Sequence, residues 1–170
     1  MLVAVVAFSF AAGIGLAGLV LSPASDSVAG STALGPVRIV LPEEVGPWSE
    51  VPTDRFEVLR HSAALGNAVI DEAWGAVTAD AVVVSVLTAA AGTHDGLDAV
   101  SGPFDEAHSL GWDGAQPYRA GWQESDGVRE LVLVVERGDG ALVMLSVSGP
   151  VAAFASGALA AAFFGARLSG

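Results

Sequence analysis

The sequence predicts an α+β fold, an antiparallel sheet packed with helices, preceded by one N-terminal transmembrane helix. Three observations support this fold class. Residues 1–21 form an apolar run without a charged side chain. Three β-rich segments near the C-terminus are separated by Asp-Gly turns, which are typical of antiparallel hairpins. Residues 93–110 and 151–168 carry large apolar residues at helical spacing.

The apolar run at the start of the sequence predicts a membrane anchor. A helix needs about 20 apolar residues to cross a hydrocarbon core about 30 Å thick, and the first charged side chain is Asp26. The run lacks the cationic start of a signal peptide and exceeds the usual length of its apolar part. We therefore expect an uncleaved single-pass anchor with the following domain outside the cytoplasm. A protein secreted after cleavage is the alternative.

The composition restricts the possible partners. The chain has 19 acidic and 7 basic residues, all of the basic ones Arg, and a net charge of -12. Nucleic acid and anionic lipid headgroups bind basic surfaces, so this balance argues against both. The chain has no Cys, which excludes disulfides, thiolate chemistry and a lipid-modified cysteine. We expect a neutral or cationic partner.

The small polar residues of 22–36 predict a flexible linker, and residues 37–170 have the length of one domain. Residues 37–41 (VRIVL) alternate and stop at Pro42, as expected of a strand. The loop 42–52 presents Trp48 after Gly46-Pro47. Residues 54–65 fit either a short helix or a strand. Further strands are expected at 68–77 and 81–88, the latter rich in β-branched residues.

The second half of the domain is predicted to contain two helical segments and a three-stranded meander. In residues 93–110, Leu97, Val100 and Phe104 are spaced for one buried face, and Gly102-Pro103 divides the helix into two pieces. Strands are expected at 118–123, 128–136 and 141–147. After Pro150, residues 151–168 are expected to form a core helix packed on the sheet rather than a second membrane span.

Two short motifs carry a resemblance to a known family. The strand VRIVLP (37–42) leads to Gly46-Pro47-Trp48, and ALVMLS (141–146) is followed by the predicted last helix. With the order of elements, these motifs resemble the PsbP-like family of α/β/α sandwich domains over residues 37–168. The sequence departs from the family in having Gly-Pro-Trp rather than Gly-Trp and an Ala-rich last helix. The resemblance implies an exported bacterial accessory or assembly protein without catalytic activity.

One cluster has the residue types of a metal site: His94, Asp95, Asp98, Asp105 and His108. On a helix, His94 and Asp98 would share a face, as would Asp105 and His108, and such ligands suit zinc. Gly102-Pro103 separates the two pairs, and a solvated polar face explains the same residues. We expect no metal. The alternative is an exported metal-dependent hydrolase that uses His94, Asp98 and His108.

No cofactor is predicted. The sequence Gly13-Ile14-Gly15-Leu16-Ala17-Gly18 matches the dinucleotide-binding fingerprint. That fingerprint requires its third glycine to open a full helix, and here Pro23 follows five residues after Gly18. The glycines are therefore interpreted as part of the membrane helix.

The aromatic and acidic residues of the loops are the predicted binding residues. Trp48 and Trp112 have glycine neighbours and are expected on loops, where amphipathic aromatic rings favour a partner surface. Asp95, Asp98 and Asp105 complete the predicted contact set. Trp74 and Trp122 are expected in the core. The predicted function is that of a membrane-anchored extracytoplasmic binding or accessory module without catalytic activity. We expect its partner to be a protein, either alone or as part of a membrane complex.

Overall fold

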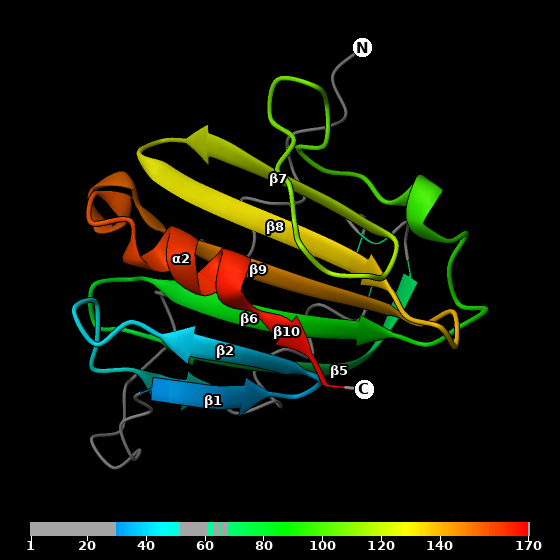
Figure 1. Cartoon of the computed structure of the whole chain (residues 1–170), viewed down its shortest axis with the longest axis horizontal. Helices are drawn as coiled ribbons and strands as arrows, with labels where there is room; N and C mark the ends of the chain where they lie inside the picture. The colour runs from blue at the N-terminus through cyan, green and yellow to red at the C-terminus, as the bar shows by residue number, and fades with distance from the viewer. Residues whose placement is uncertain (1–29, 52–60, 63–64, 66–67, 170) are drawn as a thin grey trace.

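The structure is a computed structural model that describes residues 30–51, 61–62, 65 and 68–169. Two antiparallel sheets make up most of this part of the chain, which contains a single short α-helix (Figure 1). The prediction of an α+β sandwich with several helices, including the fold that the PsbP-like resemblance implies, is therefore wrong. The two segments that were expected to be helices account for the difference.

The large sheet has seven strands in the order β3-β5-β6-β9-β8-β7, with β4 paired to β5. All neighbouring strands are antiparallel. The strands predicted at 68–77, 81–88, 118–123, 128–136 and 141–147 are confirmed with small shifts of their ends. The bounds are β3 (Ser49–Val51), β4 (His61–Ser62), β5 (Ala68–Val77), β6 (Val83–Ala89), β7 (Tyr118–Ser125), β8 (Val128–Glu136) and β9 (Leu142–Pro150).

The three C-terminal strands of this sheet form two hairpins. The turn between β7 and β8 places Asp126 at φ 53° and Gly127 at φ 77°, the left-handed pair that a two-residue hairpin turn requires. Between β8 and β9, Gly140 has φ 81°. Both Asp-Gly turns predicted from the sequence are therefore confirmed.

A small sheet of three strands has the order β1-β2-β10. Its strands are β1 (Gly30–Leu34), β2 (Val37–Leu41) and β10 (Arg167–Leu168). The strand predicted at 37–41 is confirmed. Strand β1 lies in the stretch that was expected to be a linker. This stretch is a strand because it pairs with β2 over its whole length. The described domain thus includes the last part of the predicted linker.

The small sheet covers one face of the large sheet together with two short helices, the 3-10 helix η4 (Val151–Phe154) and the α-helix α2 (Ala158–Gly165). We call residues 30–41 and 151–168 the covering layer, which Figure 1 shows in front of the large sheet. Ile39, Leu159 and Phe163 are buried from this side, and they join Val84 and Leu145 of the large sheet in one hydrophobic cluster. This cluster is the main core.

The helix predicted over 151–168 is interrupted. Gly157 lies between η4 and α2 in the left-handed conformation, at φ 79°, which an α-helix does not continue through. After Gly165 the backbone of Ala166 is extended, and the chain enters β10 beside β2. The apolar residues still face the core, but the glycines divide the segment into three elements.

The opposite face of the large sheet carries a second hydrophobic cluster. Leu87, Val132, Val134 and Met144 are among its buried residues. Strands β8 and β9 are thus buried on both faces, which explains their nearly continuous apolar sequences.

The helix predicted over 93–110 is absent except for one 3-10 turn, η3 (Leu97–Ala99). Gly96 has φ 81°, and the Asp105 carboxylate accepts hydrogen bonds from the backbone N–H groups of Ala107 and His108. Such a local turn competes with the helix for these donors. The predicted apolar face is nevertheless correct, because Leu97, Val100 and Phe104 pack in the second cluster.

Residues 1–21, which carry the predicted anchor, lie outside the described residues. So does most of 54–65, for which the sequence left helix and strand open; within it the structure describes β4 and Leu65. No helix in the described part of the chain is long and apolar enough to span a bilayer.

Candidate functional site

The connection from β6 to β7, residues 90–117, carries the acidic residues predicted to bind a partner, and we call it the acidic loop. Asp95, Asp98 and Asp105 are all exposed on it. Glu106 and Asp113 are exposed on the same loop. The structure thus brings the predicted acidic residues to one surface element.

Backbone hydrogen bonds attach the end of the acidic loop to β7. The N–H of Leu110 donates to the carbonyl of Ala120 at 2.9 Å, and the N–H of Trp122 donates to the carbonyl of His108 at 3.0 Å. Ser109 and Gly121 form the bridge between these bonds. The loop therefore adds a short strand-like segment to β7 and is fixed in register with the sheet.

Gly121 permits an unusually close approach of the loop to β7. A Cβ atom at this position would lie 1.7 Å from the carbonyl oxygen of Pro103 and 3.1 Å from that of His108. No side chain fits there, because both neighbours are backbone atoms. The loop can cross β7 at this point only over glycine.

Arg119 of β7 holds the middle of the acidic loop. One of its guanidinium nitrogens donates to the carbonyls of Val100, at 3.0 Å, and Asp98, at 3.4 Å. Its guanidinium carbon lies 5.2 Å from the centre of the Phe104 ring, a cation–π distance. Arg119 thus binds the loop through carbonyl groups and an aromatic face, and no carboxylate appears among its described partners.

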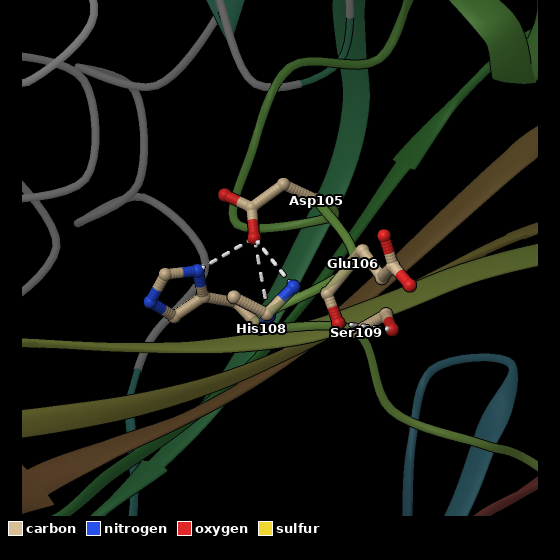
Figure 2. A network of polar contacts seen from close by, with 5 residues as sticks. Asp105, Glu106, His108 and Ser109 are labelled. Carbon is tan, nitrogen blue, oxygen red and sulfur yellow. Dashed lines mark hydrogen bonds and ion pairs between the residues drawn. The ribbon is translucent and has the colours of Figure 1, made fainter.

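Asp105 organises the turn that follows Pro103 (Figure 2). Its Oδ1 accepts hydrogen bonds from the backbone N–H groups of Ala107 (3.0 Å) and His108 (3.1 Å), and it lies 2.7 Å from Nδ1 of His108. The hydrogen bond from the His108 side chain is the main reason why the pKa of Asp105 is lowered. The His108 ring packs on Trp122, with ring centres 5.3 Å apart. The main role of Asp105 is therefore to cap this turn through its hydrogen bonds.

The metal ligands of the alternative hypothesis, His94, Asp98 and His108, do not form a cluster in the described structure. Nδ1 of His94 accepts a hydrogen bond from the N–H of Gly96 at 3.0 Å, whereas His108 pairs with Asp105 in a different turn. Among the residues that the structure describes, no group of three His, Asp or Glu side chains could hold a metal ion. The reason is the missing helix. Asp105 and His108 still contact each other in a local turn, but no helix places His94 and Asp98 beside them.

Trp48 and Trp112 were predicted to lie on the surface, and this prediction is wrong. Both side chains are buried, with exposed fractions of 1% and 7%. Both belong to the main core. Nε1 of Trp48 donates to the carbonyl of Pro42 at 2.9 Å, and the Trp112 ring contacts Tyr118 edge-to-face. Gly46 makes room for the Trp48 ring, since a Cβ atom there would lie 2.9 Å from it. The room for the Trp112 ring comes from Gly114, where a Cβ atom would lie 1.8 Å away, and not from its neighbour Gly111, where a Cβ atom would meet nothing within 4 Å. Conversely, Trp74 and Trp122 are only partly buried at the margin of this core.

A small apolar hollow lies beside Trp112 between the two sheets. Its lining residues include Val37, Leu133 and Leu168, and its volume is about 10 Å³. That volume corresponds to about one water molecule. In this conformation, the hollow does not accommodate a larger ligand.

Sequence reasoning missed a buried polar row on the second face of the large sheet. Glu130 of β8 is 5% exposed and accepts a hydrogen bond from Nε2 of Gln123 at 2.8 Å through Oε2. Its other oxygen, Oε1, has no partner among the described residues. Burial raises the pKa of Glu130 to about 7. The row also contains Ser85, Ser146 and Ser148, all buried, with the hydroxyl oxygens of Ser85 and Ser146 3.0 Å apart.

A signal for this row was present in the sequence. In β8, Glu130 occupies alternate positions with Val132 and Val134 and therefore points to the same face of the sheet. In β9, Ser146 and Ser148 share a face with Met144 in the same way. The register of the hairpin then places Glu130 opposite Ser148 and Val132 opposite Ser146. Alternation together with the predicted turns therefore contained enough information to find the row.

The acidic loop is the best candidate for an interaction site in the described structure, because its carboxylates are exposed while its backbone is fixed to the sheet. Glu130 is a titratable group in the interior and is not part of this loop. No protein-family model matches the chain, and neither does any curated protein or solved structure.

Proposed function

We propose that the chain is a membrane-anchored extracytoplasmic binding module without catalytic activity, and that its acidic loop binds a cationic segment of a protein partner. One observation carries this proposal: Asp95, Asp98, Glu106 and Asp113 are exposed on a loop that is fixed to the sheet through other groups. The carboxylates thus contribute negative charge at the surface, while backbone bonds and Arg119 maintain the shape of the loop.

The rigid attachment supports a binding role. A preordered loop loses little conformational entropy when it meets a partner. Several carboxylates of one sign attract a basic segment over distances up to about 8–10 Å in physiological salt and raise the rate of encounter. The predicted Trp contribution is not part of this proposal, since both rings are in the core.

The anchor is supported by the length and composition of residues 1–21, which match those of a membrane-spanning helix. An anchored module meets its partner at the membrane surface. A membrane complex with a basic extracytoplasmic segment is therefore the kind of partner that we propose.

The test is crosslinking of the full chain in its native membrane, followed by mass spectrometry of the captured protein. We expect the variant Asp95→Asn, Asp98→Asn, Glu106→Gln, Asp113→Asn to lose most of the crosslinked product. We also expect the yield of the wild-type product to fall with added salt, because exposed charges are screened.

The matched control removes the same charge elsewhere on the surface. Glu43, Glu44, Glu72 and Asp80 are exposed outside the acidic loop, and their amide variants should crosslink as the wild type does. Circular dichroism checks that both variants are folded. Equal crosslinking by the two variants would contradict the role of the acidic loop.

A further inference from the structure

The charges of the chain are divided between its layers. The covering layer, residues 30–41 and 151–168, contains no Asp or Glu and includes Arg38 and Arg167. All 19 acidic residues lie elsewhere in the chain, together with the other five of the seven Arg residues. The net charge of -12 therefore conceals a cationic layer on a strongly acidic remainder.

The two cationic side chains of this layer are neighbours. Arg167 of β10 lies directly opposite Arg38 of β2 in the antiparallel register, and both are exposed. Like charges in such a cross-strand pair repel each other. Neither takes part in an ion pair with another described residue, and Arg167 donates to the carbonyls of Phe164 and Ala166. An anionic group placed over the pair would relieve this repulsion.

Exposed apolar side chains belong to the same layer. Val40 shares the outward side of β2 with Arg38 and is 57% exposed. Phe164 of α2 is 42% exposed, whereas Leu159 and Phe163 of the same helix are buried. Arginine combined with exposed apolar residues is typical of surfaces that meet the headgroup region of a bilayer.

Strand β1 of the covering layer is the first element that the structure describes after the proposed anchor. Strand β1 begins at Gly30, nine residues after Leu21. Nine residues span at most about 30 Å when fully extended. The start of the layer is therefore held within that distance of the membrane surface.

We propose that the outward side of the covering layer rests on anionic phospholipid headgroups, with Arg38 and Arg167 over the phosphates and Val40 and Phe164 in the interface. Two arginines bind headgroups weakly by themselves, and the anchor makes this contact intramolecular, which raises its occupancy. The inference rests on the proposed anchor.

This orientation also serves the proposed partner binding. Leu97, Val100 and Phe104 of the acidic loop pack on the face of the large sheet opposite the covering layer. The end of the loop crosses β7, and Trp112 packs in the main core beside Val37 and Leu168 of the covering layer. With the covering layer on the membrane, the first part of the loop, with Asp95 and Asp98, therefore lies on the side of the large sheet away from the anionic lipids.

A pair of single-cysteine variants tests the orientation, because the chain has no native Cys. Ser31 is exposed on β1 of the covering layer, and Ser101 is exposed on the acidic loop. Each Ser→Cys variant of the full chain is labelled with a fluorophore and reconstituted into vesicles that contain a headgroup spin-labelled quencher lipid. The vesicles are made of phosphatidylcholine alone or of its mixture with phosphatidylglycerol.

We expect the label at Ser31→Cys to be quenched several-fold more than the label at Ser101→Cys in the vesicles with phosphatidylglycerol. Adding Arg38→Gln and Arg167→Gln should abolish the part of the quenching that depends on phosphatidylglycerol. Arg137→Gln removes a positive charge at the turn between β8 and β9 of the large sheet and should leave that quenching unchanged. Equal quenching at the two labels would overturn the proposed orientation.

Flotation of the same samples separates this inference from the proposed anchor. Chains that float with both kinds of vesicle and resist alkaline extraction are anchored, so equal quenching in them rejects the orientation alone. Chains that remain at the bottom of the gradient with both lipids reject the anchor and, with it, the inference.

Discussion

At the scale of single residues, Glu130 is the group whose environment departs most from water. Burial raises its pKa from the usual 4.5 to about 7. A carboxyl group with a raised pKa binds more protons in the folded state than in the unfolded state between these two values. Its contribution to stability is therefore present at low pH and is lost as the pH rises through about 7.

We predict that Glu130→Gln is more stable than the wild type above neutral pH, by at most about 3 kcal/mol, because the amide keeps the hydrogen-bonding shape without a buried charge. The advantage should shrink as the pH falls toward about 5, where the wild-type carboxyl is protonated. Urea unfolding over this pH range measures the difference. Glu72→Gln, on the exposed part of β5, is the control, and an advantage of Glu130→Gln that does not vary with pH would contradict the assignment.

The environment of individual residues was the hardest feature to predict from the sequence. Glycine next to Trp112 is compatible with an exposed turn and with a ring folded inward. Only the burial of the Trp112 ring in the main core shows which one occurs. Glu130 was predictable, because strand alternation and a turn of known length determine both its face and its cross-strand neighbour.

At the scale of elements, the acidic loop depends on its crossing of β7. We predict that Gly121→Ala forces the carbonyl of Pro103 away from β7 and destabilises the protein by about 1–3 kcal/mol, as overpacking does. The protection of the Trp122 and Leu110 amides against hydrogen exchange should fall more than that of amides in β9.

Gly138→Ala is the matched control for this change. A Cβ atom at Gly138 would meet no other atom within 4 Å, and its φ is not positive. We expect its stability to stay within about 0.5 kcal/mol of the wild type. Equal effects of the two substitutions would show that the close approach at Gly121 is unimportant.

Strands were predicted well and helices were not, for a physical reason. The strands of the large sheet have β-branched residues, alternation and Asp-Gly turns that all agree. In the two segments expected to be helices, the apolar spacing favoured a helix while Gly96 and Gly157 opposed it. The left-handed backbone at these glycines prevailed, so the buried residues were identified correctly but the element was not.

At the scale of the whole molecule, the two sheets share the main core and should unfold together. Phe163 is fully buried in this core, whereas its neighbour Phe164 is 42% exposed. We predict that Phe163→Ala costs about 3–5 kcal/mol and that Phe164→Ala costs much less. Tryptophan fluorescence and far-ultraviolet circular dichroism should report one coincident transition, because the indole rings of Trp48 and Trp112 lie in this core. Two separate transitions would show that the covering layer unfolds independently.

The division of charge could not be found from the sequence alone. Segments 30–41 and 151–168 lie at opposite ends of the domain, and their lack of acidic residues acquires meaning only when β2 and β10 are known to pair. A long-range pairing of two short strands leaves almost no trace in local patterns, so the composition indicated only the net acidic balance of the chain.

The pairing of β10 with β2 also has a consequence for how the protein matures. Ser169 hydrogen-bonds to Pro36 across 133 positions of sequence, so β1 and β2 meet this neighbour only after the intervening residues have been synthesised. Until then the apolar side of the β1–β2 hairpin lacks α2 and β10. A chain that is synthesised N-terminus first would expose this hairpin until α2 and β10 follow, and contacts of such long range form slowly. Removal of residues 167–169 should therefore impair maturation more than their small number suggests.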